Sequence, residues 1–545
     1  MNLDEIRKSI DKKDSEIFTK IAERLQLVEQ VVRWKDQNGK KIYDAQREKI
    51  IIQAKRELAE KLGISADTGE EILRAIIAES HIQEKKFLKN DETSPRKVRR
   101  KRILQHPNLL EIFSRISQKE KNFCFLESLG DDEWNQHSMM AFAPKKIFAA
   151  KQNEIFIDGI SQGTVKNPLD WLTQQFAPYQ NLVENSREEG FVGGLMGHMG
   201  FEAINYIEPS LQLKSHADFY DFEFGLYLDA LVYNRKTEAL EYIFIDEDRS
   251  EYIENLLLSP KQNPEISQKT KTCTGKFLKK TFSDEELDEV IAECKKEIEI
   301  GNIFQIVPSQ KFFYEISGSS LEFYTRLRKS NPSPHMFFLQ FDDRKIIGSS
   351  PEMIAKIVGK RIETYPIAGT RSRGKTPQED AKLSAEMLSD DKEVAEHLML
   401  VDMARNDLGR VCEFGSVNVE EIMALKKYSH VQHLVSRVSG KISDKSSNIE
   451  AMMSNFPMGT VSGSPRIEAI KLIAKLEKEP RGPYAGGVGF WSATGDMTFA
   501  LAIRSFFSKG NKGFAQAGAG IVYDSVPQYE REEIEKKSLN IRSLF

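Results

Sequence analysis

Two pairs of glutamates, far apart in the chain, have the spacing of a divalent-cation site. Glu393 and Glu396 lie three residues apart in a segment with a helical pattern, and Glu530 and Glu533 repeat this spacing near the C-terminus. Residues i and i+3 share one face of a helix. Mg²⁺ prefers oxygen ligands and keeps several water or substrate oxygens. If the two helices converge, the pairs predict metal-assisted chemistry on an anionic substrate; the alternative for the first pair alone is a solvated helix edge with Lys392 as its salt partner.

Residues 1–90 contain no proline, and their apolar residues recur at helical spacing. This pattern predicts one helix of roughly 35 residues and two further helices at about 44–62 and 66–89, separated by Gly39 and Gly63. Two shorter helices of the same chain cannot cover an apolar stripe of that length. We therefore expect a homodimer that pairs the long helices.

Polar residues gather on defined faces of these three helices. Arg24 and Lys35 share a face of the long helix, whereas Arg7 lies about 25 Å from Arg24 and off that face, so a dimer partner would have to receive it. The polar residues that share a face of the second or third helix are Asp44, Arg47, Glu48, Ser80 and Glu84. The pattern fits a small pocket with four cations, and it fits a salt-bridged helical dimer equally well.

The bulk composition limits the function classes. The chain has 545 residues, enough for several domains, and a net charge of −4, which gives no reason to expect nucleic acid as a partner. It shows no signal peptide and no apolar run long enough to span a bilayer. The four cysteines form no CxxC or zinc spacing. These features favour a cytoplasmic protein with no membrane partner.

The texture of the sequence changes after the helical region. Residues 91–106 are polar and basic, which predicts a solvated linker, although basic runs also bind polyanions. Beyond residue 107, strand-type runs such as 122–127, 240–245 and 344–348 alternate with helical segments such as 284–299 and 379–406. We expect a multidomain protein: an all-α three-helix domain at 1–90, a linker at 91–106 and a large α+β domain with mainly antiparallel sheets at 107–545. Within it, 258–280 is expected to be a surface excursion.

Several motifs in residues 1–90 carry a family resemblance. They are Ile6-Arg7, Ala22-Glu23-Arg24, Lys35, Asp44-x-x-Arg47-Glu48 and Ile76-Ile77-x-Glu79-Ser80. In these, the segment resembles the all-helical class of chorismate mutases, which rearrange chorismate to prephenate. The residues that the resemblance assigns to the two carboxylates of chorismate are Arg24, Lys35 and Arg47, with Arg7 from a second subunit. Those assigned to its hydroxyl and neighbouring polar groups are Asp44, Glu48 and Ser80.

One position departs from that family. Glu84 stands where the family usually places glutamine against the ether oxygen, and with Lys35 it is the catalytic candidate of this region. Such a domain works by selecting a folded conformer and stabilising charge as the ether bond breaks. Glu84 also supports an alternative, in which residues 1–90 are a regulatory sensor of chorismate or prephenate.

The remainder of the chain contains a dense series of motifs. They are Gly301-Asn-Ile-Phe-Gln305, Asn331-Pro-Ser-Pro, Ser350-Pro351-Glu352, Pro366-Ile-Ala-Gly-Thr370, Arg405-Asn406-Asp407, Val431-Gln-His-Leu434, Arg481-Gly-x-Tyr484-x-Gly486, Ile503-Arg504 and Gln516-Ala-Gly-Ala-Gly520. In these, residues 107–545 resemble component I of anthranilate synthase and its chorismate-using relatives. The resemblance implies that the two glutamate pairs hold Mg²⁺ against the ring carboxylate of chorismate, with Glu396 and Glu533 as direct ligands and Glu393 and Glu530 beside them or acting through water.

The same resemblance assigns roles to other residues. Those expected to bind the enolpyruvyl carboxylate are Tyr484, Arg504, Gly518, Gly520 and Lys537, and those expected to line the ring are Gly369 and Thr370. Glu352 would be the general acid for the departing ring hydroxyl, a role that needs a pKa raised by burial. His433 would act in the later loss of pyruvate, with His430 as its rival.

Two positions select among the relatives. Relatives that add water carry a lysine base where this chain has Gln305, and glutamine cannot deprotonate water. Relatives that make aminodeoxychorismate for folate carry a nucleophilic lysine where this chain has Ala368. Both favour nitrogen transfer to ring position 2 and anthranilate as the product. The remaining alternatives are an aminodeoxychorismate synthase component I and an enzyme that stops at aminodeoxyisochorismate.

The resemblance also bears on partners. A glutaminase needs a nucleophilic cysteine in a glycine-flanked turn, and none of Cys124, Cys273, Cys294 and Cys412 has that setting, so ammonia is expected from a separate glutaminase subunit. A tryptophan feedback site is implied by Leu126-Glu127-Ser128 together with the segment from Asn331 to Phe338. Its expected ligand residues are Glu127, Ser128, Pro332 and Met336. A packed strand-edge motif that binds no ligand is the alternative.

Overall fold

The chain folds into two compact units, residues 1–95 and 96–545. The computed structural model describes residues 3–37, 45–70, 72–73, 76–77, 80, 98–129, 136–180, 190–258, 272–427 and 431–545. None of the helices in this described part combines the length and apolarity that a bilayer-spanning segment needs.

The first unit is helical. It contains α1 (Leu3–Gln37), α2 (Ala45–Lys61) and a third helical segment that is described at residues 66–70, 72–73, 76–77 and 80. The lengths predicted for the first two helices agree with those of α1 and α2 to within two residues. Gly69 permits the close packing of the third segment on α2, because a Cβ atom there would lie 2.5 Å from Cβ of Ala59.

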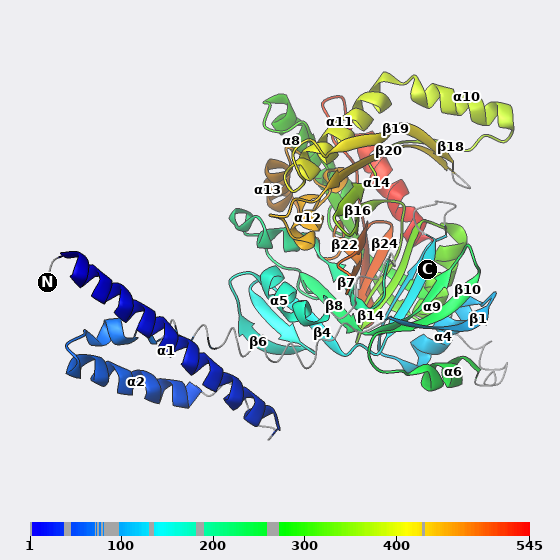
Figure 1. Ribbon diagram of the computed structural model, residues 1–545. Coiled ribbons are helices and arrows are strands. Elements are labelled where there is room, and N and C mark those ends of the chain that lie inside the picture. Colours follow the sequence, from blue (N-terminus) through cyan, green and yellow to red (C-terminus); the bar gives the residue numbers. More distant parts are fainter. Residues whose placement is uncertain are drawn as a thin grey trace. The chain divides into compact units, whose positions relative to one another are not determined.

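The second unit is built on two large antiparallel sheets (Figure 1). The 11-stranded sheet has the order β1 (Arg99–Gln105), β10 (Ala239–Phe244), β9 (Asp229–Asn234), β3 (His137–Phe142), β2 (Asn122–Glu127), β14 (His335–Phe341), β15 (Arg344–Ser350), β24 (Ser505–Lys509), β25 (Lys512–Gly518), β13 (Ser309–Ser317) and β11 (Thr274–Lys280). The second sheet has the order β18 (Ile367–Ser372), β20 (Val431–Lys441), β17 (Arg361–Thr364), β16 (Met353–Val358), β23 (Met497–Leu501), β22 (Gly487–Ser492), β7 (Gly194–Met199), β8 (Phe222–Tyr227), β4 (Lys146–Lys151), β5 (Glu154–Ile157) and β6 (Ile160–Thr164), with β19 (Asn418–Lys427) paired to β20. A short pair joins β12 (Gln305–Ile306) to β21 (Gly463–Ser464).

Helices surround these sheets. They are α4 (Leu109–Lys119), α5 (Pro168–Gln180), α6 (Ser250–Leu258), α8 (Asp284–Glu299), α9 (Ser320–Ser330), α10 (Pro377–Leu388), α11 (Asp391–Gly409), α12 (Asn448–Ser454), α13 (Arg466–Leu476) and α14 (Pro527–Arg542). The predicted fold class, an all-α domain followed by an α+β domain with antiparallel sheets, is confirmed.

The central strands of the 11-stranded sheet are buried on both faces, as β14 shows. Phe337 and Leu339 join the core between the two sheets, whereas Met336 and Phe338 join the core beneath the helices. Successive strand residues point to opposite faces, so a run of apolar residues is the pattern that a doubly covered strand requires. This packing fixes the strand ends from which the functional residues project.

Three sequence predictions need correction. The segment 379–406 is two helices, because the chain turns at Ser389 and the Asp390 carboxylate accepts from the Glu393 N–H at the start of α11, 3.3 Å away. Residues 99–105 of the predicted linker form β1, which pairs with β10. The Arg100 side chain forms an ion pair with Glu241 of β10. Residues 274–280 of the predicted excursion form β11 at the edge of the same sheet. Residues 91–97 and 259–271 lie outside the described part of the chain.

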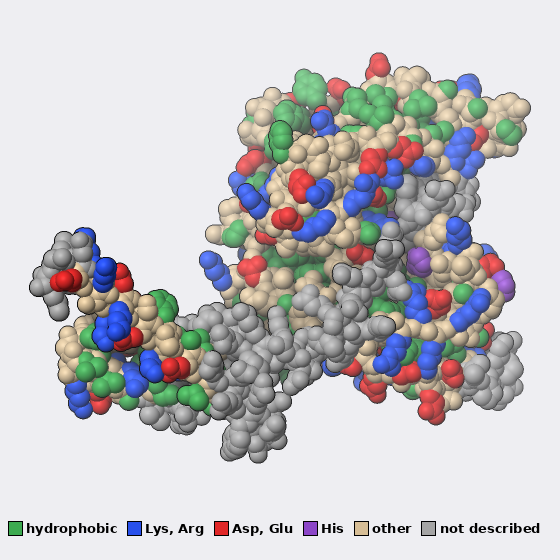
Figure 2. All heavy atoms as spheres, in the orientation of Figure 1, with side chains coloured by type: hydrophobic (Ala, Val, Ile, Leu, Met, Phe, Trp, Pro, Cys, Tyr) green, Lys and Arg blue, Asp and Glu red, His purple; other side chains and the backbone are tan. Residues whose placement is uncertain are grey.

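Acidic and basic side chains are interspersed on the face of the second unit shown in Figure 2. No single sign of charge dominates that face, which agrees with the small net charge of −4. The expectation that nucleic acid is not a partner therefore stays a prediction based on charge.

An exposed apolar stripe runs along α1. Ile10, Ile17, Leu27 and Val31 are all exposed, and helical geometry places them within about 100° of one another. A fragment of residues 1–95 should therefore form a dimer in sedimentation velocity, and Ile17→Glu should convert it to a monomer. Lys8→Glu, on the opposite side of the helix, should leave the dimer intact. A monomeric wild-type fragment would contradict the predicted pairing of the long helices.

Candidate active site

One cavity of about 600 Å³ in the second unit collects most of the residues predicted to do chemistry. It lies between α11, α14 and the ends of β18, β20 and β25. The predicted residues that line it are Gln305, Glu352, Ala368, Gly369, Glu393, Glu396, His433, Tyr484, Arg504, Gly518, Gly520, Glu530, Glu533 and Lys537. Thr370 pairs with His433 between β18 and β20, and its side chain lies outside the described set, as does the whole of His430.

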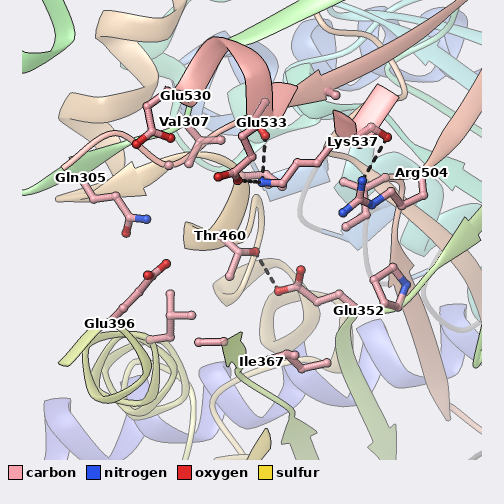
Figure 3. A pocket seen from close by; sticks show the side chains of 18 of the residues that line it. Gln305, Val307, Glu352, Ile367, Glu396, Thr460, Arg504, Glu530, Glu533 and Lys537 are labelled. Carbon is pink, nitrogen blue, oxygen red and sulfur yellow. Dashed lines mark hydrogen bonds and ion pairs between the residues drawn. The ribbon is translucent and has the colours of Figure 1, made fainter. Parts of the chain in front are cut away.

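The two glutamate pairs approach this cavity from opposite sides. Figure 3 shows Glu396 on α11 facing Glu530 and Glu533 on α14 across the open space. Glu393 accepts a hydrogen bond from Arg371 Nη1 at 2.7 Å. Glu533 forms an ion pair with Lys537 at 2.5 Å. The carboxylates thus converge on one volume, as the spacing alone could not establish.

These oxygens fit a hard cation that is shared with a substrate. Among the described residues, no three His, Cys, Asp or Glu side chains come close enough to hold a metal ion by themselves. Mg²⁺ commonly takes one or two protein carboxylates and completes its octahedron with water and substrate oxygens. Two facing carboxylate pairs provide the right donor chemistry for that arrangement.

Glu352 is a buried carboxyl on the cavity wall. Its Oε1 accepts from the Thr460 hydroxyl at 2.8 Å, and its N–H donates to Ser350 Oγ. Burial raises the pKa of Glu352 from 4.5 to about 7, although the Thr460 hydrogen bond and the Lys537 charge oppose the shift. A carboxylic acid with this pKa can hold and deliver a proton near neutral pH.

His433 presents a neutral imidazole to the same cavity. Its Nδ1 lies 2.9 Å from the carbonyl oxygen of Gly369. A carbonyl only accepts, so the proton is on Nδ1 and Nε2 carries the basic lone pair. Burial lowers the pKa of His433 and the Arg504 charge lowers it further, against the effect of the Gly369 contact. The ring is therefore a base at neutral pH.

Cationic groups gather at one end of the cavity. Arg504 Nη1 donates to the carbonyl oxygen of Lys537 at 3.0 Å, and Lys537 Nζ donates to the carbonyl oxygen of Gly518 at 3.2 Å. Gly518 cannot carry a side chain, because a Cβ atom would lie 2.7 Å from the Pro308 carbonyl and 3.2 Å from the Tyr484 hydroxyl. Two cations beside a close backbone approach suit a carboxylate of the substrate.

Gln305 and Ala368 decide which nucleophiles the cavity itself supplies. Gln305 is buried against Gly520, where a Cβ atom would meet its Nε2 at 2.8 Å, and its Oε1 has no hydrogen-bond partner among the described residues. Ala368 places a methyl group on the wall. Neither residue can act as a nucleophile or as a strong base.

A family model described as chorismate binding enzyme matches residues 121–543, and one described as chorismate mutase type II matches residues 6–85.

The chain belongs to the chorismate-binding enzyme family.

Among its relatives, "Anthranilate synthase component 1" of Methanothermobacter marburgensis is 41% identical over 443 residues, which cover 81% of this chain and 93% of that protein. The protein of the same name from Saccharolobus solfataricus is 42% identical over 441 residues, or 80% and 96% of the two chains. The crystal structure of anthranilate synthase component I from Streptococcus pneumoniae matches with a TM-score of 0.65 and 31% identity over 76% of this chain and 94% of that one.

In the chorismate mutase type II region, two of the residues predicted to bind substrate are in contact. Arg24 Nη1 donates to Ser80 Oγ at 2.6 Å, which joins two of the predicted substrate-binding residues. Arg7 is exposed on α1. The side chains of the other predicted residues, Lys35, Asp44, Arg47, Glu48 and Glu84, lie outside the described part of the chain.

The four residues predicted for the feedback site of this chorismate-binding enzyme do not all line one cavity. Glu127 and Met336 line a second cavity of about 40 Å³, which has room for about three water molecules. Glu127 accepts two hydrogen bonds from Arg328 at 2.8 Å and one from the Tyr324 hydroxyl. Ser128 is buried and Pro332 is exposed, and neither lines this cavity. An amino acid would fit here only if the strands around the cavity moved apart.

The structure adds functional candidates that sequence reasoning missed. Thr460 bonds Glu352 and Arg371 holds Glu393. The Gly-, Ser- and Pro-rich stretch from Pro457 to Pro465 was the available signal for Thr460, since backbone approaches ligands closely in such segments.

A buried relay also reaches the cavity. Arg481 holds the Glu477 carboxylate, which accepts from Ser309 Oγ at 2.8 Å, and Ser309 Oγ in turn accepts from Gln516 Nε2 at 2.8 Å. This order fixes the Gln516 amide, so its Oε1, which has no hydrogen-bond partner among the described residues, is an acceptor of defined orientation. Ser309 and Glu477 lie outside every sequence motif and gave no signal.

The raised pKa of Glu352 predicts a pH-dependent stability difference. The unfolded chain releases this proton near 4.5 and the folded chain near 7, so the folded state loses stability as pH rises through that window. At pH 8, Glu352→Gln should therefore be more stable than wild type: its free energy of unfolding should be greater by up to about 3 kcal/mol, and it should unfold at a higher temperature. This difference should vanish by pH 4.5. Calorimetry at both pH values measures it, with the exposed Glu386→Gln as control. Equal shifts at both pH values would show that Glu352 does not carry the raised pKa.

Proposed function

We propose that the second unit converts chorismate and ammonia to anthranilate and pyruvate, and that the first unit rearranges chorismate to prephenate. The observation that carries the proposal is the single cavity in which a protonated carboxyl, a neutral histidine, two cations and two facing carboxylate pairs meet. Each group has a counterpart in chorismate, which carries two carboxylates, a ring hydroxyl as leaving group and an enolpyruvyl ether.

The first half of the reaction uses Glu352 as the acid. Ammonia forms a bond to ring carbon 2, the ring double bonds shift, and the hydroxyl at carbon 4 leaves as water with the Glu352 proton. The pKa of about 7 supports this role, because about half of the acid is still protonated at pH 7. The product of this step is an amino, non-aromatic ring that still carries the enolpyruvyl ether.

The second half uses His433 as the base. Nε2 takes the proton from ring carbon 2, the ring becomes aromatic, and the ether carbon–oxygen bond at carbon 3 breaks, so that the leaving group departs as the enolate of pyruvate and takes up a proton at its methylene carbon. The lowered pKa and the Gly369 contact keep Nε2 able to accept. Arg504, Lys537 and the backbone at Gly518 are placed to hold the enolpyruvyl carboxylate during both halves.

Mg²⁺ is the proposed cofactor, with Glu396 and Glu533 as ligands and Glu393 and Glu530 beside them. When bound, it would neutralise the ring carboxylate and favour departure of the leaving group as a Lewis acid. Without a cation, four carboxylates and a substrate carboxylate would repel one another across the cavity.

Gln305 and Ala368 support anthranilate over the alternatives. The folate-route alternative needs an amine nucleophile at the Ala368 position, and water addition needs a base at the Gln305 position; both side chains line the cavity and neither has that chemistry. His433 in reach of the ring supports aromatisation over release of aminodeoxyisochorismate.

A separate glutaminase subunit is the proposed source of ammonia. All four cysteines are free, and burial raises the pKa of Cys273, of Cys294 to about 12 and of Cys412 to about 11. Cys124 is likewise buried with a strongly raised pKa. The thiolate is the nucleophile, so none of these groups is suited to release ammonia from glutamine.

Two further parts of the proposal concern the first unit and regulation. The Arg24–Ser80 contact supports a chorismate-binding pocket in the first unit, either as a mutase in a homodimer or as a regulatory sensor. Tryptophan feedback at Glu127 and Met336 would require the small cavity there to open.

The purified chain with chorismate, Mg²⁺ and an ammonium salt should yield equimolar anthranilate and pyruvate, measured by fluorescence and a coupled pyruvate assay. Glutamine should replace ammonium only after a glutaminase subunit is added. Prephenate formation, followed separately, reports the first unit. Release of an aminated non-aromatic ring, or turnover of glutamine by the single chain, would contradict the proposal.

A further inference from the structure

The hydroxyl of Thr460 is the polar neighbour of the buried acid Glu352. It donates to Oε1 of Glu352 at 2.8 Å, and both residues line the main cavity. Among the described residues the hydroxyl contacts no other acceptor, so its proton is committed to Oε1. Figure 3 shows this contact, with the other carboxyl oxygen of Glu352 turned toward the open space of the cavity.

This contact decides which oxygen of Glu352 carries the acid proton. A protonated carboxyl group has one O–H and one oxygen that only accepts. Because Oε1 accepts from Thr460, the proton is carried by Oε2, the oxygen on the cavity side. A proton on Oε1 would face Thr460 instead of the cavity.

The backbone around Thr460 is held in place. Thr460 is the middle residue of the short helical turn η3 (Gly459–Val461). The carbonyl oxygen of Val461 accepts from Nη1 of the buried Arg481 at 2.7 Å, and the carbonyl oxygen of Ser462 accepts from the Val307 N–H at 3.0 Å. These bonds fix the turn against the opposite wall of the cavity.

A second arginine ties the same segment to α11. Arg466 Nη1 donates to the carbonyl oxygen of Ser454 at 2.8 Å, and its Nη2 forms an ion pair with Asp407. Asp407 ends the Arg405-Asn406-Asp407 motif, to which the proposed chemistry gave no role. The two side chains of the pair are mostly buried, so water and salt screen it little. The turn that carries Thr460 is therefore anchored on both sides.

We propose that Thr460 is a positioning residue of the aminating reaction, whose hydroxyl keeps the Glu352 proton on Oε2 and directed at the departing ring hydroxyl. This inference rests on the proposed function. In the step itself the proton passes from Oε2 to the leaving hydroxyl, which departs as water, and Glu352 becomes a carboxylate. The Thr460 hydroxyl still donates to Oε1 and now stabilises the negative charge.

Other groups in the cavity also act on Glu352. The charged and titratable side chains that line it are Glu393 and Glu396 of α11, His433 of β20, Arg504, and Glu530, Glu533 and Lys537 of α14. Burial raises the pKa of Glu352 to about 7, and the Thr460 hydrogen bond and the Lys537 charge lower it. Removal of the hydroxyl should therefore raise this pKa further, whereas a change confined to packing would leave it where it is.

The kinetic test compares Thr460→Val with Thr460→Ser at saturating chorismate, Mg²⁺ and ammonium. Thr460→Val should lower kcat about tenfold at pH 6, where Glu352 is largely protonated in both proteins, because the proton is no longer held on Oε2. The ratio of variant to wild-type kcat, in which the pH dependence of free ammonia cancels, should then rise about fivefold or more between pH 6 and pH 9. That rise corresponds to a pKa increase of about one unit. Thr460→Ser should behave as wild type.

A second measurement follows the Glu352 carboxyl without turnover. The infrared C=O band of the protonated acid, assigned by its loss in Glu352→Gln, is titrated in the full chain. Its midpoint should move up by about one pH unit in Thr460→Val and in Thr460→Ala, which adds no bulk, and stay unchanged in Thr460→Ser. The matched control is Thr173→Val, at an α5 threonine whose hydroxyl donates to the Leu169 carbonyl at 2.9 Å and which does not line the cavity. It should change neither the band nor kcat.

Other results would overturn the inference. An infrared midpoint that is the same in wild type, Thr460→Val and Thr460→Ala would show that the hydroxyl does not act on Glu352. A Thr460→Ser variant as slow as Thr460→Val would assign the effect to the methyl group. Absence of anthranilate formation by wild type would instead reject the proposed function, and a shifted infrared midpoint would then still show the contact, so the two failures are distinguishable.

Discussion

Four glutamates from two helices face one another around a single cavity, and this arrangement of like charges constrains the rest of the site. Unscreened carboxylates at such a place repel, so each pair has a cation in contact: Arg371 for Glu393 and Lys537 for Glu533. The two helices come from distant parts of the chain, and the sheets are what bring them together. α14 packs on β25 and α8, while α11 packs on β18 and β20.

Burial then separates the roles of the other titratable groups. Glu352 and His433 lie in the same cavity, yet burial raises the pKa of the carboxyl to about 7 and lowers that of the imidazole, so at pH 7 about half of the carboxyl is still protonated while the imidazole is neutral. One can give a proton and the other can take one, which is the combination that a displacement followed by an elimination needs.

The sequence predicted local features better than their meeting in space. The run 122–127 is β2 and the pattern 284–299 is α8, since alternation and helical periodicity are local properties. Two helices are separated at Ser389 and Asp390, where the sequence pattern predicted a single helix. A capping residue does not interrupt the apolar periodicity, so the pattern gave no sign of this boundary. Only the family resemblance predicted that Glu396 and Glu533 face each other. The relay from Glu477 through Ser309 to Gln516 was not predicted, because its members are far apart in sequence. Pro332 was assigned to a ligand site from its motif, yet it is exposed and does not line the small cavity.

In the proposed site, the two glutamate pairs share one divalent cation with the ring carboxylate of the ligand. This sharing can be measured as Mn²⁺ binding by electron paramagnetic resonance with and without anthranilate. We expect one Mn²⁺ per chain, bound more tightly when anthranilate supplies its carboxylate, and an affinity loss of about tenfold or more in both Glu396→Gln and Glu533→Gln but not in the exposed control Glu386→Gln. Binding that survives either substitution, or that ignores anthranilate, would contradict the shared site.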